Sequence, residues 1–206
     1  MCGGKGTRLE SPHEKPLHPI GGTPMVDRVV AALAESRVET ISVAVSPNAP
    51  ETRAHLERAA REREALTTVE TPGEGYVTDL MQVLERDDVS TPILTVAADL
   101  PLLEAPVVDR VLARHRDSDR SRTVCVPVAL KRRLGVSVDA RLESRSHLAP
   151  TGLNVVGDAD ADSIDIHYDP RLAVNVNRLE DARIAAERIP NRTGEPVRDR
   201  DEPDTQ

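Results

Sequence analysis

Residues Ile93–Ala98 form a run of strand length that is apolar apart from Thr95 and ends directly before Asp99. A strand that is apolar on both faces is buried on both faces, as in the parallel sheet of an α/β protein. In such sheets the residues that act on ligands follow the carboxyl ends of the strands. The run therefore predicts an α/β fold and places Asp99 at its ligand-binding edge.

Strand-like and helix-like segments alternate along the rest of the chain. Apolar residues recur at helical spacing after Thr23, which we expect to cap a helix whose first residue is Pro24. The other expected helices cover residues 48–64, 76–86, 104–116 and 178–189, and the extended segments cover residues 16–20, 40–45, 67–70, 93–98, 123–129, 152–157, 164–168 and 172–176. This alternation predicts a three-layer α/β/α sandwich with a mainly parallel, Rossmann-like sheet.

Three segments carry additional expectations. A proline within residues 123–129 predicts a strand near an edge of the sheet. Residues 130–148 are charged and irregular, which suits a lid or an excursion toward a second substrate. We expect one domain over residues 1–189, because 206 residues are typical of a single domain. Residues 190–206 have almost nothing to bury, so we expect a disordered tail of acidic and basic residues.

The glycine-rich stretch Cys2–Arg8 contains three glycines and two cations, and Lys15 follows it closely. Glycines let the backbone turn where a side chain would clash, so that several amide groups can converge on one anion. The stretch lacks the GxxxxGK[ST] spacing of a P-loop and the last glycine of a dinucleotide-binding fingerprint. It therefore predicts a polyphosphate site of another kind. The expected members of that site are Gly3, Gly4, Lys5, Gly6, Thr7, Arg8 and Lys15.

Two motifs, Gly3-Gly4-Lys5-Gly6-Thr7-Arg8 and Glu14-Lys15-Pro16-Leu17, resemble those of nucleotidyltransferases that join an NTP to a phosphorylated acceptor and release pyrophosphate. Within that superfamily, residues 1–189 resemble the archaeal GTP:adenosylcobinamide-phosphate guanylyltransferases of cobalamin assembly. Further matching segments are Ser46–Pro50, Thr71–Tyr76 with Asp79-Leu80, Ala98–Leu100, Pro150–Val156 and Val174–Asn177. The resemblance implies a nucleotide-diphospho-sugar-transferase-like fold, with GTP and a corrinoid phosphate as substrates.

The implied reaction is the attack of an acceptor phosphate oxygen on the α-phosphorus of GTP, which depends mostly on positioning and charge neutralisation. The resemblance assigns neutralisation to Arg8 and Lys15. It makes Asp99 a ligand of Mg²⁺, an ion that proteins hold through one or two carboxylates while phosphates and waters complete the shell. The alternative is that the Asp99 side chain caps the turn that follows it. Asn177 is a second candidate for a metal ligand. A role as the cap of the helix that starts at residue 178 fits Asn177 about as well.

Two more segments are expected beside the nucleotide. Ser46 and Asn48 belong to one of them, although Asn48 and the glutamate three residues later also fit a capping box. Gly73 and Gly75 belong to the other, for which a ligand loop and a plain turn fit equally. Asp79 is either an acceptor for guanine N1 and N2 or a favourable charge in the first turn of its helix.

The acceptor side is expected at Pro150, Thr151, Gly152 and Asn154. This assignment follows from the resemblance, because periodicity alone predicts only the start of a strand there.

A glycine-rich phosphate loop normally follows a buried strand, because the end of that strand directs the loop at the ligand. Here the sequence begins at the loop itself. A missing central strand leaves two unpaired edges inside a sheet, which is costly. We therefore expect that the start of the gene has been placed a few residues late.

The formal net charge is −8, and only three of the 27 basic residues are lysines. This acidic, lysine-poor composition predicts a halophilic source, with a GC-rich genome as the alternative. Two of the three lysines are Lys5 and Lys15, which favours point-charge roles for them. We expect no nucleic-acid partner, because the sequence has no basic face with aromatic residues that could stack on bases. We expect no membrane insertion, because the sequence has no apolar run of about 18 residues. A cytoplasmic protein follows, and the family suggests a homodimer.

Two other functions fit the same motifs. A molybdenum-cofactor or sugar-phosphate nucleotidyltransferase keeps the fold and changes the acceptor, although sugar enzymes usually carry a longer carboxyl-terminal part. A nucleotide-binding regulatory protein without turnover is the other alternative. The intact glycine-rich stretch, Lys15 and Asp99 argue against it.

Overall fold

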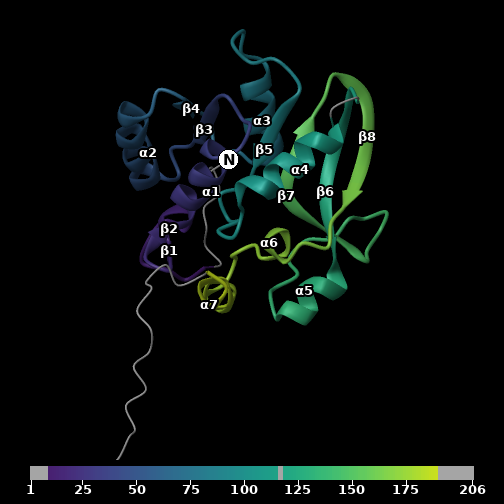
Figure 1. Ribbon diagram of the computed structural model, residues 1–206. Coiled ribbons are helices and arrows are strands. Elements are labelled where there is room, and N and C mark those ends of the chain that lie inside the picture. Colours follow the sequence, from purple (N-terminus) through teal and green to yellow (C-terminus); the bar gives the residue numbers. More distant parts are fainter. Residues whose placement is uncertain (1–8, 116–117, 190–206) are drawn as a thin grey trace, which may run out of the picture.

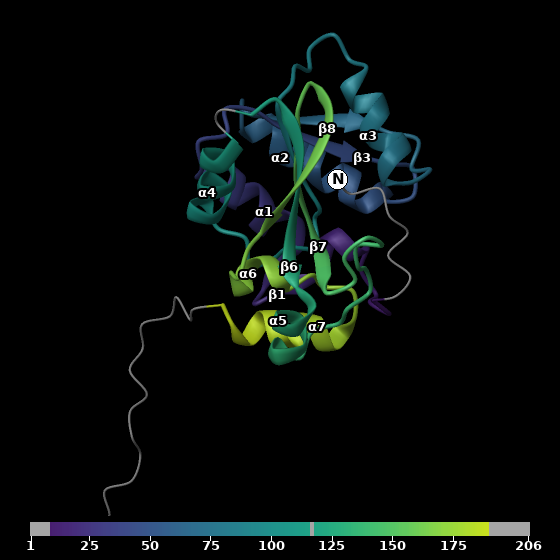
Figure 2. The ribbon, with the colours of Figure 1, turned by 90° about the vertical axis from the view of Figure 1, so that its right-hand side faces the viewer.

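The computed structural model describes residues 9–115 and 118–189, and it has the expected α/β architecture (Figure 1). When the strands are viewed from the β8 edge, α1 (Met25–Ala34) and α4 (Ala105–His115) lie on one side of them (Figure 2). The helix α3 (Tyr76–Leu84) lies on the other side. The prediction of a three-layer α/β/α sandwich is confirmed.

Two parallel strands form the first sheet. β3 (Ile41–Val45) pairs with β4 (Leu66–Glu70) along its whole length. The helix α2 (Pro50–Glu62) connects them, because parallel neighbours need a crossover. It buries Leu56 against this sheet.

The second sheet is mixed. Its strand order is β5 (Ile93–Val96), β7 (Leu148–Val156), β6 (Arg120–Pro127) and β8 (Ala159–Ile166). β7 runs antiparallel to both of its neighbours, whereas β6 and β8 are parallel. Among the described strands, the expected parallel pairing therefore holds for β3 with β4 and for β6 with β8.

Residues 123–129 are expected near an edge of the sheet, and β6 is an inner strand directly beside the edge strand β8. Pro127 is its last residue, so the missing N–H lies where the strand ends.

Two expectations are wrong for the segments around this sheet. Residues 130–148 are not irregular throughout, since they begin inside α5 (Val128–Leu134), which ends at Gly135 with φ 78°. Residues 172–176 are not a strand, because they start within the short helix α6 (Pro170–Ala173). Asp169 caps α6 by accepting a hydrogen bond from the Arg171 amide, and proline suits the first helical position.

A tight hairpin precedes the first long helix. β1 (Pro19–Ile20) and β2 (Thr23–Pro24) are antiparallel and joined by Gly21-Gly22, whose φ values are 59° and 80°. Positive φ at both central residues is what a type I′ turn requires. Because Thr23 belongs to β2, α1 begins at Met25 with Pro24 in the N-cap position, and the expected Thr23 cap is wrong.

Aliphatic side chains build the core, as expected for a chain without Phe or Trp. The largest cluster joins α1, α4, β5, β6 and β7, and its members Val107, Val124 and Leu153 are completely buried.

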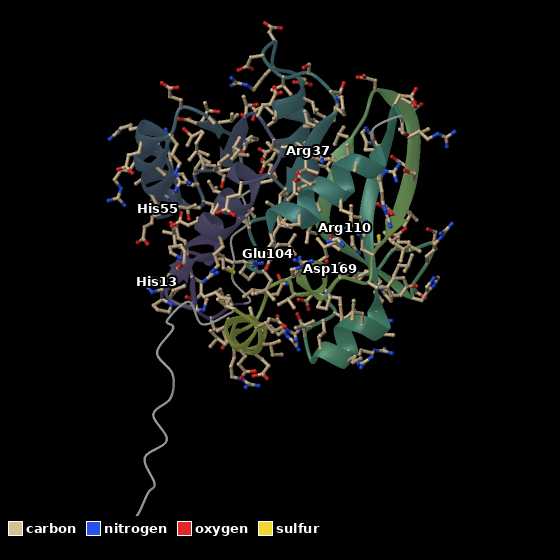
Figure 3. The ribbon with its side chains drawn as sticks, viewed as in Figure 1. His13, Arg37, His55, Glu104, Arg110 and Asp169 are labelled. Atoms are coloured by element: carbon tan, nitrogen blue, oxygen red, sulfur yellow. The ribbon has the colours of Figure 1, made fainter. Side chains whose placement is uncertain are left out.

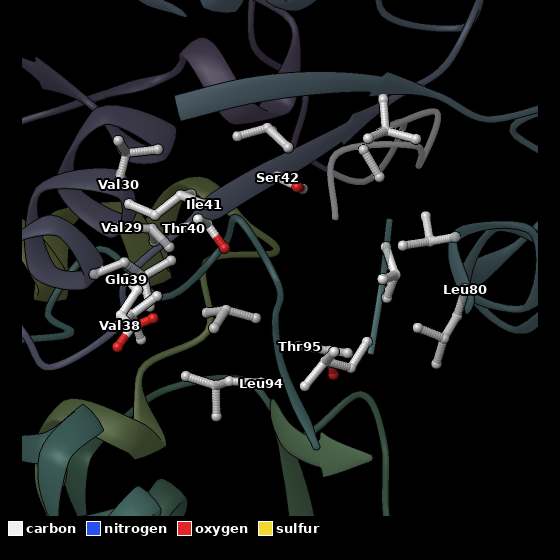
Figure 4. Close-up of a pocket in the computed structure, with 18 of the residues that line it drawn as sticks. Val29, Val30, Val38, Glu39, Thr40, Ile41, Ser42, Leu80, Leu94 and Thr95 are labelled. Carbon is white, nitrogen blue, oxygen red and sulfur yellow. The ribbon is translucent and has the colours of Figure 1, made fainter. Parts of the chain in front are cut away.

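A cavity of about 420 Å³ lies between β3 and β5 and is lined mostly by apolar side chains (Figure 4). Within residues 9–115 and 118–189, no strand lies between these two.

Candidate active site

Lys15 lies between two oxygen atoms from distant parts of the chain. Its Nζ donates hydrogen bonds to Asp99 Oδ2 at 2.8 Å and to Asn177 Oδ1 at 2.7 Å. The Lys15 and Asp99 side chains are 21% and 17% exposed, so the pair is largely buried but accessible from solvent. The structure thus brings together three residues that the sequence singles out.

Three elements hold these side chains in place. Lys15 begins the 3₁₀ turn η1 (Lys15–Leu17), and Asp99 follows β5. Asn177 lies just before α7 (Leu179–Glu187), and the neighbouring Val176 amide donates to the Asp99 carbonyl oxygen at 2.9 Å. This bond ties the segment before α7 to the end of β5.

The capping alternative for Asn177 is wrong, because Arg178 is the N-cap of α7. The carboxylate of Asp181 accepts hydrogen bonds from the Asn177 and Arg178 amides and satisfies the start of that helix. The Asn177 side chain is therefore available to Lys15.

Asn175 was missed by the sequence analysis. Its Nδ2 donates to Asp99 Oδ1 at 3.0 Å and to the Thr151 carbonyl oxygen at 2.8 Å. Both carboxylate oxygens of Asp99 are thus hydrogen-bonded, one to Asn175 and the other to Lys15. The pattern Asn-Val-Asn at 175–177 was a usable signal, since alternate residues of an extended segment share a face.

The third lysine, Lys131 of α5, was also missed. Its side chain is 3% exposed, and its Nζ donates to Ala173 O at 2.6 Å and Asn175 Oδ1 at 3.0 Å. Burial lowers the pKa of Lys131, while the charges of nearby Asp181, Asp99 and Asp139 act in the opposite direction. Lys131, Asn175 and Asp99 therefore form one chain of hydrogen bonds leading to Lys15.

The two loops expected beside the nucleotide contact each other. Asn48 Nδ2 donates to the Gly73 carbonyl oxygen at 3.0 Å, and the Gly73 amide donates to Asp79 Oδ1 at 2.9 Å. A Cβ at Gly73 would lie 2.5 Å from Asn48 Nδ2 and 2.7 Å from Ser46 Cβ. Four of the expected nucleotide-binding residues, Ser46, Asn48, Gly73 and Asp79, thus form one cluster, in which the buried Asp79 supports the Gly73 loop.

The capping-box alternative for Asn48 is wrong, since Ala49 is the N-cap of α2 without a side-chain hydrogen bond. Glu14 satisfies this helix end instead, because its carboxylate accepts from the Glu51 and Thr52 amides at 3.0 and 2.7 Å. Burial opposes ionisation of Glu14, but the hydrogen bonds from Thr52 and Glu51 lower its pKa overall. The residue before Lys15 is thereby fixed to α2.

A second polar group joins α3 to the second sheet. Tyr76 Oη lies 2.8 Å from Thr95 Oγ1, and Asn154 Nδ2 donates to Tyr76 Oη at 3.2 Å. Tyr76 is 42% exposed. Asn154, expected on the acceptor side, is thus held beside the loop that precedes α3.

The side chain of Thr151, a residue expected on the acceptor side, is completely buried and donates to the Val124 carbonyl oxygen. Pro150 and Gly152 lie on β7 beside it. Gly152 has φ 81°, and a Cβ there would lie 2.8 Å from Ala97 Cβ. Gly152 therefore lies close to Ala97, just after β5, and near Asn175.

Part of the expected site lies outside the described residues. This part consists of Gly3, Gly4, Lys5, Gly6, Thr7 and Arg8, and the expected tail at residues 190–206 lies outside them as well.

The cavity between β3 and β5 is separate from the Lys15 group, since Lys15, Asp99 and Asn177 are not among its lining residues. Within the described ranges, no group of three or more His, Cys, Asp or Glu side chains is arranged for a metal. The helices of that same part of the chain are all too short or too polar to cross a membrane.

Comparison with known proteins gives matches along most of the chain. It is 29% identical over 193 residues to the adenosylcobinamide-phosphate guanylyltransferase of Methanocaldococcus jannaschii, covering 90% of this chain and 93% of that protein. It is 31% identical over 133 residues to the bifunctional protein GlmU of Bifidobacterium adolescentis, covering 62% of this chain but 28% of that protein.

Solved structures share the fold at low sequence identity. A putative glucose-1-phosphate thymidylyltransferase from Bacillus anthracis superposes with a TM-score of 0.61 at 16% identity, covering 91% of this chain and 94% of that one. A CMP:2-keto-3-deoxy-manno-octonic acid synthetase superposes with a TM-score of 0.57, also at 16% identity, covering 87% and 96%. Residues 1–170 match the family model of the MobA-like NTP transferase domain, so the chain belongs to this family and is a nucleotidyltransferase.

Proposed function

We propose that the chain transfers GMP from GTP to adenosylcobinamide phosphate, giving adenosylcobinamide-GDP and pyrophosphate. The observation that carries this proposal is the similarity to the guanylyltransferase of M. jannaschii, which extends over 93% of that protein. The similarity to GlmU covers only 28% of GlmU and supports a shared nucleotidyltransferase domain.

The proposed reaction joins two anions. An oxygen of the acceptor phosphate attacks the α-phosphorus of GTP, the bond from that phosphorus to the bridging oxygen breaks, and pyrophosphate leaves with the electron pair. Positive charge at the phosphates is therefore the main requirement. We assign it to Lys15 and Arg8, and we assign the β- and γ-phosphates to the amides of Gly3, Gly4, Lys5, Gly6 and Thr7.

The oxygen atoms around Lys15 fit a magnesium ion. Asp99 Oδ2 and Asn177 Oδ1 both lie within 2.8 Å of one cationic atom, Lys15 Nζ, so they already converge on a positive charge. Carboxylate and amide oxygens are ligands that hard divalent cations prefer. We propose that Asp99 and Asn177 hold Mg²⁺, which when bound neutralises phosphate charge. Asn175 then keeps the Asp99 carboxylate in one orientation through its hydrogen bond to Oδ1.

The guanosine is proposed to lie over the two loops that Asn48 and Gly73 join. Gly75 supports this placement, because its φ is 127° and the space where a side chain would stand is open. Ser46 and Asn48 supply polar groups nearby, and Asp79 positions the loop through the Gly73 amide. We place the acceptor beside Pro150, Gly152 and Asn154.

A sugar-phosphate nucleotidyltransferase is the second candidate, because it would keep the fold and the nucleotide-side motifs and change the acceptor. A molybdenum-cofactor guanylyltransferase is the third candidate, and it differs from our proposal in its acceptor alone.

The deciding experiment measures pyrophosphate release with Mg²⁺ and three substrate pairs, at low and at molar KCl. The pairs are GTP with adenosylcobinamide phosphate, GTP with molybdopterin, and TTP with glucose 1-phosphate. We expect release with the first pair, and calorimetry should show GTP binding more tightly than ATP or CTP. Release with glucose 1-phosphate alone, or a preference for CTP, would contradict the proposal.

A further inference from the structure

The ammonium group of Lys131 is buried against uncharged acceptors. The residue is 3% exposed, and within residues 9–115 and 118–189 its Nζ donates to the Ala173 carbonyl oxygen and to Asn175 Oδ1. Removing an ammonium group from water is costly unless a counter-charge or hydrogen bonds compensate for it. Leucine or methionine would fill the same space without this cost, so packing alone does not account for a lysine here.

Two neighbouring helices bring Lys131 to the candidate active site. α5 carries Lys131 and α6 ends at Ala173, and both lie below the strands in Figure 2. The segment between α6 and α7 then carries Asn175 and Asn177. Lys131 contacts the start of this segment twice, at the main chain of Ala173 and at the side chain of Asn175.

The lysine determines which end of the Asn175 amide faces it. An ammonium group only donates hydrogen bonds, so the amide oxygen faces Lys131 and the amide nitrogen points away. That nitrogen donates to Asp99 Oδ1 at 3.0 Å and to the Thr151 carbonyl oxygen at 2.8 Å. The reversed amide would set its oxygen against the Asp99 carboxylate and its N–H groups against the ammonium. Only one orientation of this amide therefore satisfies its neighbours.

The orientation of the amide in turn affects Asp99. Because Oδ1 of Asp99 accepts from Asn175, Oδ2 is the oxygen that faces Lys15 Nζ, at 2.8 Å. In the proposed function, Oδ2 is also the oxygen assigned to the cation. A change at Lys131 would thus reach Asp99 through one intervening side chain.

We propose that Lys131 is a positioning residue of the active site, which fixes the Asn175 amide so that the amide fixes the Asp99 carboxylate. The link to turnover rests on the proposed function, whereas the orientation of the amide can be measured on the protein alone. The competing interpretation is structural, since lysine side chains also bind the last carbonyl groups of helices, and Ala173 ends α6.

A second anchor holds the same segment independently of Lys131. The Asp181 carboxylate accepts hydrogen bonds from the Ser137 and Asn177 amides at 2.7 and 3.1 Å. The Val176 amide donates to the Asp99 carbonyl oxygen at 2.9 Å. The main chain at residues 176–177 should therefore keep its place when Lys131 is replaced, so that the effect on the side chains can be observed.

The test uses four variants of the full chain. Lys131→Met removes the charge and the donors but keeps an unbranched side chain. Arg133→Met is the matched control, because it removes an exposed cation from the same helix. Asn175→Ala and the double variant Lys131→Met/Asn175→Ala complete a double-mutant cycle. A residue that acts wholly through Asn175 has no further effect once Asn175 is gone.

The first measurement needs neither substrate nor metal. Heteronuclear NMR follows the exchange of side-chain amide protons with water. Those of Asn175 should exchange more slowly in the wild type than those of the exposed Asn48, because the Asn175 nitrogen donates to two protein oxygens. Lys131→Met should speed up this exchange and Arg133→Met should not. Equally fast exchange of Asn175 and Asn48 in the wild type would overturn the proposal even if Lys131→Met did not fold.

The second measurement is turnover, with GTP and adenosylcobinamide phosphate or with the substrate pair that the wild type does accept. We expect Lys131→Met to lower kcat by about ten-fold, which is the usual effect of losing a group that orients a metal ligand. The Mg²⁺ concentration for half-maximal rate should rise, while the affinity for Mg²⁺·GTP stays close to that of the wild type. The double variant should be no slower than Asn175→Ala.

Two further results would overturn the proposal. Losses of kcat that add up in the double variant would mean that Lys131 does not act through Asn175. An unchanged Asn175 amide in Lys131→Met, with a lower free energy of unfolding as the only effect, would leave Lys131 as a cap of α6. A wild type without turnover on any substrate pair would contradict the proposed function instead, and the amide measurement would still decide whether Lys131 orients Asn175.

Discussion

Lys15 is the cation that contacts both Asp99 and Asn177 in the part of the chain that the structure describes. We expect Lys15→Ala to weaken GTP binding at least about ten-fold, because a hydrogen bond to a charged group contributes about 1.5–3 kcal/mol. Isothermal titration with Mg²⁺·GTP measures this. The control is Arg37→Ala, which removes a cation from the exposed pair with Asp109. Equal affinities in all three proteins would remove Lys15 from the proposed site.

Substitution of Asp99 should lower the turnover rate more than it lowers the affinity for GTP. We expect Asp99→Ala to lower kcat by about a hundred-fold or more, since neutralisation of the phosphates is the main contribution that the site makes. Its GTP affinity should change much less. Steady-state kinetics over a range of Mg²⁺ concentrations measure both, with the exposed Asp88→Ala as control. Normal turnover of Asp99→Ala at limiting Mg²⁺ would contradict the metal assignment.

At the residue scale, the sequence could reveal Lys15 and Asp99 because each has a local sign of its role, a rare lysine in a motif or a carboxylate after a buried strand. Glu14 and Lys131 had no such sign. Glu14 caps a helix that begins 36 residues later, and Lys131 stands in a charged run whose other basic residues, Arg132 and Arg133, are not buried. Roles that arise from long-range contacts need the fold before they can be seen.

Substitution of Gly73 tests how closely the two nucleotide-side loops must approach each other. We expect Gly73→Ala to destabilise the protein by about 2–4 kcal/mol, because a side chain is strained at φ 73° and its Cβ would meet Asn48 and Ser46. Gly22→Ala is the matched control, with φ 80° but open space around the added Cβ. Urea unfolding of both variants separates the close approach from the backbone strain. Equal losses would show that packing against Asn48 is unimportant.

The cap of α6 positions the segment that carries Asn175 and Asn177. Asp169 accepts hydrogen bonds from the Arg171 amide and guanidinium, and Arg110 lies beside it (Figure 3). We expect Asp169→Ala to lower the free energy of unfolding by about 1–2 kcal/mol. Asp169→Asn should lose less of this free energy, because asparagine keeps the cap. Urea unfolding at neutral pH gives both values, and an Asn variant as unstable as the Ala variant would contradict the capping role.

Acid should weaken this same element. The hydrogen bond from Arg171 lowers the pKa of Asp169 from its ordinary value against the opposing effect of burial. A carboxyl with a lowered pKa stabilises the fold fully above its unfolded pKa, and this contribution is lost as the pH falls through the folded pKa. The stability difference between the wild type and Asp169→Asn should therefore be constant above about pH 5 and shrink below about pH 4. A difference that stays constant down to pH 3 would contradict this assignment.

At the scale of elements, the alternation of strands and helices was predictable, whereas the order of the strands in the sheet was not. The order of β6 within the sheet depends on which strands pair, and pairing is not a local property of residues 120–127. α6 was a different error, because aspartate followed by proline at 169–170 is a local sign of a helix start.

At the scale of the whole molecule, the net charge does not reveal the charges at the candidate site. Its formal charge is −8, yet the group around Lys15 contains one ammonium, one carboxylate and two neutral amides. The family and the layered fold could be predicted from short motifs and periodicity. The antiparallel course of β7 between β5 and β6 could not, because it depends on segments that are far apart in the sequence.

The contact of Lys15 with both Asp99 and Asn177 means that the resting site carries its own counter-ion. A free divalent cation entering alone has to displace a like charge, whereas a nucleotide arriving with its cation offers the lysine new anions to bind. We therefore expect the melting temperature to respond little to millimolar MgCl₂ or to GTP with EDTA, and to rise with the two together. Loading of metal and nucleotide is then a single event, governed by which partner the ammonium group holds.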